Sequence, residues 1–266
     1  MLLDFEKLGA LRWALAALCV AVCLFLTLPI VFIVLLSFGS SRWLAFPPPD
    51  WTLKWYIEFF SNKQWIASIV TSAQIAAVVS VLSLVIGLLA SFAVVRGNFR
   101  GRGLLRSFLI TPLVLPVVVL AVGLYALFLR IGLSGTFIGL VIAHLVIALP
   151  FSIIVISNSL ASFDKSIEDA AVLCGASPLK AKLQVTLPSI RISLFGAALF
   201  SFLASWDEVV LAIFMSSARL QTFPVRIWTT LRQDLTPVIA AASTLLVAIT
   251  IVILLITALS AKRWTK

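Results

Sequence analysis

Hydrophobic residues are distributed along this chain in long uninterrupted runs, and polar residues gather in the segments between them. A helix that spans a bilayer needs about 20 mainly apolar residues, and six runs reach that length. They cover residues 11–38, 65–95, 108–129, 136–158, 192–217 and 237–260. Transmembrane β-strands alternate in polarity over about 10 residues, which these runs do not. The pattern therefore predicts an all-α, polytopic membrane protein with six transmembrane helices.

Composition supports this fold class. Of the 266 residues, 62% are hydrophobic and 11% are charged, whereas a soluble domain carries about 25% charged residues. So few charges cannot cover the surface of a soluble protein of this length. We expect one transmembrane domain over residues 1–266, with a core at about 66–260. The first run exceeds the 7–15 residues or so of a signal-peptide core, so we expect it to be retained as a membrane helix.

Basic residues are unevenly divided between the two sides that six spans would create. Thirteen fall in the segments that share a side with the termini, and seven fall on the other side. The thirteen are Lys7, Arg12, Arg96, Arg100, Arg102, Arg106, Lys165, Lys180, Lys182, Arg191, Lys262, Arg263 and Lys266; the seven are Arg42, Lys54, Lys63, Arg130, Arg219, Arg226 and Arg232. The positive-inside rule then predicts both termini in the cytoplasm. It also explains the net charge of +10 without nucleic-acid binding.

The segment between the first two runs, FPPPDWTLKWYIEFFSNKQW, combines prolines with aromatic residues. The prolines exclude a helix at its start, and Thr52 is expected to cap a short helix after them. Aromatic side chains concentrate at membrane–water interfaces. We therefore expect five of them to lie in the headgroup layer: Trp51, Trp55, Tyr56, Phe59 and Phe60.

The polar segment 159–191 is the longest between predicted spans on the cytoplasmic side, and it is patterned. Ser166 and Asp169 have capping-box spacing, which predicts the start of a short helix, and Gly175 is a plausible end for it. Ser177 followed by Pro178 predicts the start of a second helix, which would run to residue 187 and end before a proline. This helical hairpin is either a plain surface feature or a docking element for a partner with a groove.

The same segment resembles the EAA motif of type I, binding-protein-dependent ABC importer permeases. That motif reads E-A-A, three residues, Gly, nine residues, I-x-L-P. Here Asp169, Ala170 and Ala171 precede VLC and Gly175, and nine residues lead to VTLP, which ends in Leu187 and Pro188. Asp169 replaces the usual Glu, and the Val of VTLP replaces Ile. Glu168, the residue before Asp169, is a candidate to compensate for the shorter acid.

The resemblance implies that this segment forms coupling helices that sit in a cleft of a cytoplasmic ATPase. The implied coupling residues are Glu168, Asp169, Ala170, Ala171, Gly175, Leu187 and Pro188, and small side chains there permit close approach. The sequence has no Walker A motif and no Gly-Lys dipeptide. We therefore expect a transport subunit rather than an enzyme, without metal or cofactor, and we expect ATP and Mg²⁺ to be bound by the partner ATPase.

The fifth run contains two adjacent acids, Asp207 and Glu208. A charge at the bilayer centre costs about 2.5–3.5 kcal/mol, so the pair is not expected to face lipid. A continuous helix places Asp207 about 24 Å beyond Arg191, in the outer half of the membrane. Either the acids pair with an arginine such as Arg219, Arg226 or Arg232, or they attract a cationic substrate. The candidate substrate pathway comprises Asp207, Glu208, Trp206, Ser205 and Ser201, with Trp206 as a cation–π surface.

The stretches FSFLASWDEVVLAIFM and TFPVRIWTTLRQDLTPVIAAASTLL resemble the second membrane subunit of spermidine/putrescine permeases. The resemblance extends from about Trp51 to the last run, and it implies a polyamine substrate. It also implies four kinds of partner: a second permease subunit in a heterodimer, two ATPase subunits, a periplasmic binding protein and the lipid bilayer. Related permeases carry other amines and opine-like compounds, so another amine, an amino-acid-derived solute or an opine-like solute stays open.

Other polar residues leave further interpretations open. His144, in the middle of the fourth run, is either functional or bonded to a serine or backbone group within the bundle. Asp234 either contacts a binding protein or pairs locally with Arg232. A proton- or sodium-driven secondary transporter that uses Glu208 or His144, and a membrane scaffold, are the rival functions. Cys19, Cys23 and Cys174 favour neither a disulfide nor a metal site.

Overall fold

The computed structural model describes residues 9–233 and 236–264. In this part of the chain the regular elements are helices, and one antiparallel β-bridge joins Gly39 to Trp51. Internal contacts separate the chain into two compact units, one of Met1–Asn62 with Thr230–Ile251 and one of Lys63–Thr229 with Val252–Lys266.

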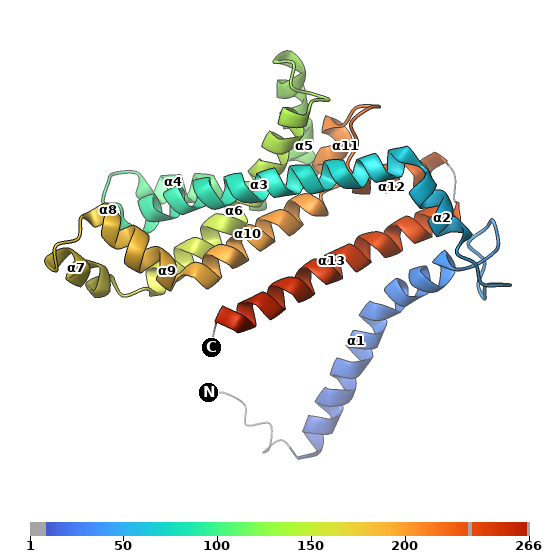
Figure 1. Ribbon diagram of the computed structural model, residues 1–266, viewed down its shortest axis with the longest axis horizontal. Helices are drawn as coiled ribbons and strands as arrows, with labels where there is room; N and C mark the ends of the chain where they lie inside the picture. The colour runs from blue at the N-terminus through green and yellow to red at the C-terminus, as the bar shows by residue number, and fades with distance from the viewer. Residues whose placement is uncertain (1–8, 234–235, 265–266) are drawn as a thin grey trace. The chain divides into compact units, whose positions relative to one another are not determined.

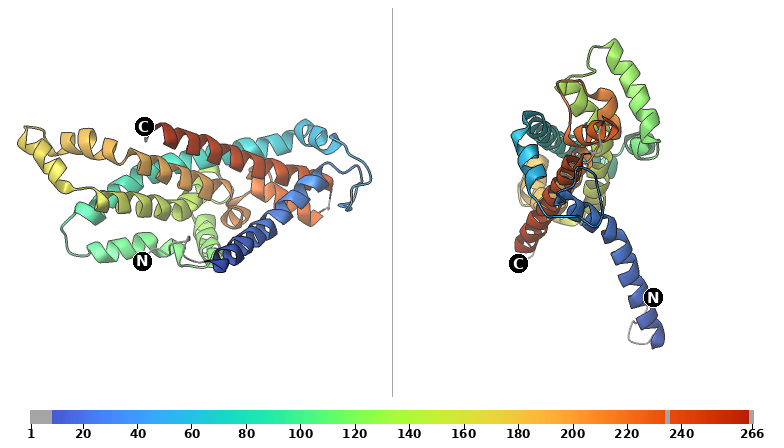
Figure 2. Two further views of the ribbon diagram at one scale, coloured as in Figure 1. Left: turned by 90° about the horizontal axis from the view of Figure 1, so that it is seen from below. Right: turned by 90° about the vertical axis from the view of Figure 1, so that its right-hand side faces the viewer.

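Three helices form the body of the second unit: α3 (Lys63–Arg96), α6 (Phe137–Ser162) and α10 (Arg191–Trp206). They pack against one another along their lengths (Figures 1 and 2). Gly87 of α3 lies so close to α6 that an added Cβ would be 2.7 Å from the Cβ of Ser152. In lipid, the hydrophobic effect does not drive helices to associate. Van der Waals contacts between closely approaching small residues therefore stabilise the packing.

Serine side chains cross the helix interfaces of this body. Ser80 donates to the carbonyl oxygen of Ala198 at 2.7 Å, which joins α3 to α10. The hydroxyls of Ser152 and Ser201 lie 2.8 Å apart, which joins α6 to α10. Interhelical hydrogen bonds of this kind contribute about 0.6 kcal/mol each on average. The three helices are therefore held by small apolar contacts together with a line of buried hydroxyl groups.

The third apolar run does not form one helix. It is divided between α4 (Arg102–Ile110), the 3₁₀ turn η2 (Thr111–Leu113) and α5 (Val117–Arg130). The two arms, Arg102–Leu113 and Val117–Arg130, are bent by 100°. Pro112 and Pro116 lie at the bend, where each lacks an amide donor and its ring clashes with the preceding turn. The expectation of a continuous span over 108–129 is therefore wrong.

The fifth apolar run is also interrupted. Helix α10 ends at Trp206 and α11 (Val210–Met215) begins four residues later, so the expectation of a single helix over 192–217 is wrong.

Four described helices are long and apolar enough to span a bilayer: Leu11–Ser37, Lys63–Arg96, Phe137–Ser162 and Pro237–Thr257. Two bent pairs, α4–α5 and the segment Pro178–Ser189 with α10, raise that number to six if each pair crosses once. The fourth of these spans lies within α13 (Pro237–Trp264), and α12 (Phe223–Gln233) precedes it in the chain.

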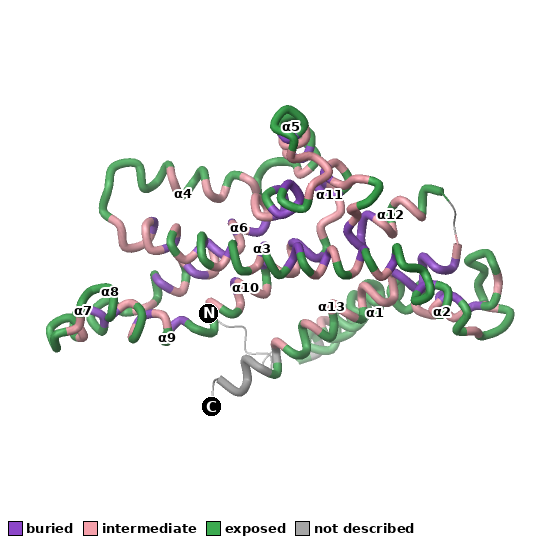
Figure 3. Tube along the Cα trace, turned by 45° about the horizontal axis from the view of Figure 1, so that its top comes forward, coloured by how far each residue is buried: buried purple, intermediate pink, exposed green. Residues whose placement is uncertain are grey.

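The first unit contains α1 (Ala10–Ser37) and α2 (Lys54–Ser61). The most apolar window of α1 is 0% buried, and Figure 3 shows this helix almost entirely as exposed. Thr52 accepts a hydrogen bond from the Lys54 amide at 3.1 Å, although Leu53 is the residue that precedes the helix.

The aromatic side chains in α2 and just before it differ in exposure. Trp51 and Phe60 are exposed, but Trp55 and Phe59 are 5% and 0% exposed. The Trp55 indole donates to the carbonyl oxygen of Gly39 at 2.7 Å, and the Tyr56 hydroxyl lies 2.7 Å from that of Ser37. Trp55 and Phe59 therefore pack inside the protein rather than against lipid, and the headgroup depth of the five side chains stays a prediction.

Candidate functional site

The patterned segment after α6 begins with α7 (Lys165–Leu173). Asp164 precedes the helix, and its carboxylate accepts a hydrogen bond from the Ser166 amide at 2.9 Å. The predicted capping box of Ser166 and Asp169 is wrong, since Ser166 already lies in the first turn. Hydrogen bonds from the Ser166 amide and side chain lower the pKa of Asp164, and the nearby Arg96 charge adds to this effect.

Helix α7 ends in a Schellman turn at Gly175, as its sequence position predicts. The Gly175 amide donates to the Val172 carbonyl oxygen at 2.9 Å, and the Ala176 amide donates to that of Ala171 at 3.1 Å. Gly175 has φ +96°, a left-handed conformation that side chains with a Cβ rarely adopt. An added Cβ would have no neighbour within 4 Å, so space around Gly175 is open to a partner.

The second half of the hairpin begins at Ser177, whose hydroxyl accepts from the Lys180 amide at 3.3 Å. Helix α8 (Pro178–Ala181) is followed by a π-helical turn, η3 (Lys182–Thr186), and by α9 (Leu187–Ser189). The helix was expected to end before Pro188, and that boundary is wrong. The wider π turn lets the backbone continue through a residue that has no amide donor. Leu187 packs with Leu160 and Ile190, whereas Pro188 is exposed.

Neighbouring acids on α7 have opposite environments. Glu168 is 7% exposed, and its carboxylate accepts a hydrogen bond from the Thr186 hydroxyl at 2.8 Å. The Asp169 side chain is 60% exposed and lies 4.0 Å from the Lys165 ammonium group. Glu168 therefore joins the two halves of the hairpin, and Asp169 is the acid that a partner can reach.

Several large apolar side chains on the hairpin surface are not part of the EAA motif, so the motif did not predict their exposure. Leu173, Leu179, Leu183 and Ile167 are 89%, 67%, 54% and 50% exposed. Figures 1 and 2 show this hairpin at the end of the α3–α6–α10 body, and Figure 3 shows it as largely exposed. Exposed apolar residues that gather on one element are candidates for contact with a partner protein or a membrane. Helical periodicity within α7 and α8 would have predicted that these side chains lie on the outer face of the hairpin.

The two acids of the fifth run lie at the break between α10 and α11. Asp207 follows the last turn of α10 and is exposed. Glu208 is half-buried, and its carboxylate accepts a hydrogen bond from the Leu211 amide at 2.8 Å at the start of α11. Over residues 9–233 and 236–264, neither carboxylate forms an ion pair with a Lys or Arg side chain. An ion pair with another subunit stays open.

The other predicted pathway residues do not line an open face together with these acids. Ser201 is 0% exposed and donates to the Ala148 carbonyl oxygen at 3.2 Å. Ser205 lies against His144, with 2.9 Å between its hydroxyl oxygen and Nδ1. The pathway role of these serines stays a prediction.

Trp206 is also buried, at 2% exposed, and it stacks on Phe202 with ring centroids 6.1 Å apart. His144, at 1% exposed, has the serine partner that was one of its two interpretations. Asp234 lies outside the described residues, so its two interpretations stay open.

Comparison with protein-family models gives one match that covers most of the chain. Residues 83–265 match the family described as "Binding-protein-dependent transport system inner membrane component". The chain belongs to this family. It is accordingly a multi-pass membrane subunit of a transporter that depends on a binding protein, and a transport component rather than an enzyme.

Curated relatives of this permease include two proteins that cover nearly its whole length. A spermidine/putrescine transport system permease protein, PotC, of Haemophilus influenzae is 29% identical over 90% of this chain and 93% of its own. A putrescine transport system permease protein, PotI, of Escherichia coli strain K12 is 31% identical over 84% of this chain and 81% of its own. The predicted membership of the ABC permease family is confirmed.

Solved structures support the fold of this permease. A bacterial ABC transporter involved in import of the acidic polysaccharide alginate matches with a TM-score of 0.77 at 15% identity. The match covers 99% of this chain and 98% of the solved chain. The predicted all-α, type I ABC importer permease fold is therefore confirmed.

Proposed function

We propose that this permease forms the translocation pathway of an ATP-driven importer for a small cationic substrate, a polyamine such as spermidine or putrescine. The observation that carries the proposal is the pair Asp207 and Glu208 at a helix break, without a basic partner in the described chain. The names of the PotC and PotI relatives support the same substrate class.

The break between α10 and α11 suits a cation better than a continuous helix would. Asp207 is exposed there, and Glu208 uses one carboxylate oxygen to cap α11. The remaining oxygens face no compensating charge, so an ammonium group gains an attraction of about 4 kcal/mol at 4 Å for an effective dielectric constant near 20. Trp206 is buried, so the attraction rests on the two carboxylates rather than on a cation–π contact.

The energy for import comes from separate ATPase subunits in this proposal. The hairpin of α7, α8 and α9 offers four exposed apolar side chains, an exposed Asp169 and small residues at Ala170, Ala171 and Gly175. Such a surface suits docking into a protein groove. Two ATPase subunits bind it and its counterpart, and they hold the ATP and Mg²⁺ that this chain does not bind.

The remaining partners and the topology follow from the same assembly. A second, related permease pairs with this chain as a heterodimer, which offers a protein surface for the unburied α1. A periplasmic binding protein delivers the substrate. Six crossings place both termini on the side of the basic segments, which is the cytoplasm by the positive-inside rule.

The test is uptake of labelled putrescine and spermidine by the complete transporter that carries Asp207→Asn with Glu208→Gln. We expect uptake to fall at least tenfold, because about 1.4 kcal/mol of lost attraction corresponds to a factor of ten. Glu58→Gln, an exposed acid in α2, is the matched control and should keep wild-type uptake. Wild-type uptake by the double variant at equal expression would overturn the substrate assignment.

The energy source is tested separately in vesicles with the membrane potential collapsed. Uptake that continues with ATP inside the vesicles supports the ABC mechanism. Uptake that stops although ATP is present would instead favour a secondary transporter that uses Glu208 or His144.

A further inference from the structure

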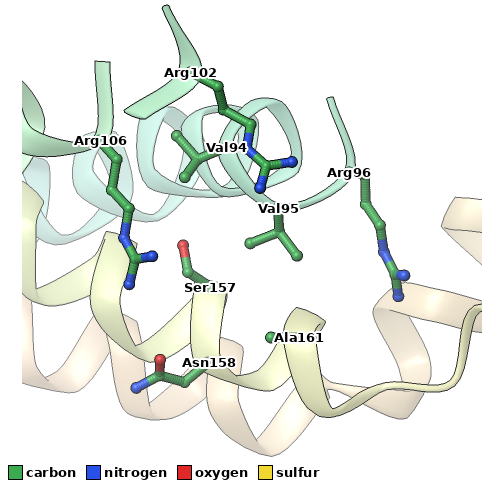
Figure 4. A pocket seen from close by; sticks show the side chains of 8 residues that line it. All are labelled: Val94, Val95, Arg96, Arg102, Arg106, Ser157, Asn158 and Ala161. Atoms are coloured by element: carbon green, nitrogen blue, oxygen red, sulfur yellow. The ribbon is translucent and has the colours of Figure 1, made fainter. Parts of the chain in front are cut away.

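A basic pocket has a lining that includes neither residues of the hairpin of α7, α8 and α9 nor the acid pair Asp207 and Glu208. It has a volume of about 390 Å³ and is formed by the end of α3, by α4 and by the last turns of α6 (Figure 4). Its lining residues are Val94, Val95, Arg96, Arg102, Arg106, Ser157, Asn158 and Ala161. Three guanidinium groups therefore surround a cavity whose lining contains no acidic residue.

The three arginines are not equivalent. Arg96 donates to the carbonyl oxygens of Leu160 at 3.1 Å and Phe163 at 2.9 Å, so it caps the C-terminal end of α6. Its charge also acts on Asp164. The Arg96 side chain therefore has a structural role, and its charge is partly compensated by these carbonyl groups and by Asp164.

Arg102 and Arg106 are different, because they have no carboxylate partner among the residues that the structure describes. Arg102 donates to the Gly97 carbonyl oxygen at 3.1 Å. Both side chains extend from α4 toward α6, and Arg106 lies beside Ser157 and Asn158 (Figure 4). Two neighbouring charges without a carboxylate partner attract an anion to this position.

Helix α4 also presents apolar side chains outward. Leu104 and Phe108 are 77% and 72% exposed, while Arg102 and Arg106 are four residues apart and share the face that lines the pocket. A helix with a basic face and an exposed apolar face lies in the plane of a membrane interface. The anion that meets such a helix is therefore carried by a lipid, whose acyl chains cover Leu104 and Phe108.

We propose that this pocket binds the headgroup of an anionic phospholipid. Arg102 and Arg106 bind the phosphodiester oxygens, which the planar guanidinium group matches with two parallel hydrogen bonds. The Asn158 amide donates to the headgroup. The Ser157 hydroxyl, which itself donates to Ser91 at 3.1 Å, accepts from a headgroup hydroxyl. A bound lipid would tie α4 to the end of α6.

The test measures phosphatidylglycerol that stays bound to the complete transporter, by native mass spectrometry from nanodiscs of phosphatidylcholine with a minor fraction of phosphatidylglycerol. Arg102→Gln with Arg106→Gln should lower the affinity about 30-fold, because each basic residue near an anionic surface contributes about 1 kcal/mol. Arg100→Gln removes a charge from the same loop outside the pocket, and it should retain the lipid. Equal retention by the double variant would overturn the proposal.

A second variant tests the pocket without changing its charge. Ala161→Phe places a ring in the cavity and should also release the lipid, even if the double glutamine variant does not assemble. Equal retention of phosphatidylcholine and phosphatidylglycerol would show that the site does not recognise an anionic headgroup. Full displacement of phosphatidylglycerol by glycerol 3-phosphate would assign the site to a soluble phosphate ester and overturn the lipid assignment.

Discussion

The Thr186 hydroxyl donates a hydrogen bond of 2.8 Å to the carboxylate of Glu168, and both residues are buried in the hairpin of α7, α8 and α9. Thr186 belongs to the π turn η3, and Glu168 belongs to the first turns of α7. This bond joins the two helical arms that Gly175 separates. In the proposed assembly, force that the ATPase applies to α7 would reach α9 and α10 through this buried polar contact as well as through the backbone.

Thr186→Val leaves a buried carboxylate without its donor. Hydrogen bonds to charged groups contribute about 1.5–3 kcal/mol, and an unpaired buried partner costs the full desolvation penalty. We expect faster amide hydrogen exchange in α7 and a loss of substrate-stimulated ATPase activity in the assembled transporter. The double variant Glu168→Leu with Thr186→Val should recover much of the exchange protection, because it removes both polar groups.

Asp169→Asn is the matched control for this prediction, since Asp169 is the neighbouring acid and its side chain is 60% exposed. An exposed ion pair contributes between about 0 and 1 kcal/mol, so exchange protection in α7 should change little. Unchanged protection in Thr186→Val, or equal loss in Asp169→Asn, would contradict the structural role of the Glu168 contact.

Long apolar runs predicted the helices α1, α3, α6 and α13 well, because their boundaries follow where polar residues resume. They did not predict the bend between α4 and α5 or the break after Trp206. Hydrophobicity reports which residues avoid water, whereas a break depends on backbone donors, as at Pro112 and Pro116. A continuous run of apolar residues therefore does not imply a continuous helix.

The motif residues of the hairpin were found by spacing, but their orientations were not. Spacing alone cannot show that Glu168 points inward and Asp169 outward, because that depends on where η3 packs against α7. The same limit applies to Ser201 and Ser205. Helical periodicity places them on one face, and the structure turns that face toward α6 rather than toward an open cavity.

Gly87→Ala tests the closest approach between α3 and α6. The new Cβ would lie 2.7 Å from the Cβ of Ser152, so the helices must separate, and overpacking of this kind costs about 1–3 kcal/mol. We expect a lower thermal unfolding temperature for the purified complex. Adding Ser152→Gly should restore part of the loss by removing the opposing atom.

Gly196→Ala in α10 is the control for the Gly87 prediction, because an added Cβ there meets nothing within 4 Å. Alanine is also the better helix former by about 1 kcal/mol. Gly196→Ala should leave thermal stability unchanged or higher. Equal destabilisation by the two substitutions would mean that contact with Ser152 does not decide the effect.

The contact between His144 and Ser205 predicts a measurable coupling between α6 and α10. The 2.9 Å distance between Nδ1 and the serine hydroxyl indicates a hydrogen bond within the bundle, and such bonds contribute about 0.6 kcal/mol on average and up to about 1.7. A double-mutant cycle with His144→Ala and Ser205→Ala, measured by unfolding in mixed micelles, should give a coupling energy in that range. A cycle of His144→Ala with Ser201→Ala should give none, because Ser201 bonds to Ser152 and Ala148 instead. Equal coupling in both cycles would show that removing the imidazole loosens the whole helix interface, and the specific pairing with Ser205 would then be wrong.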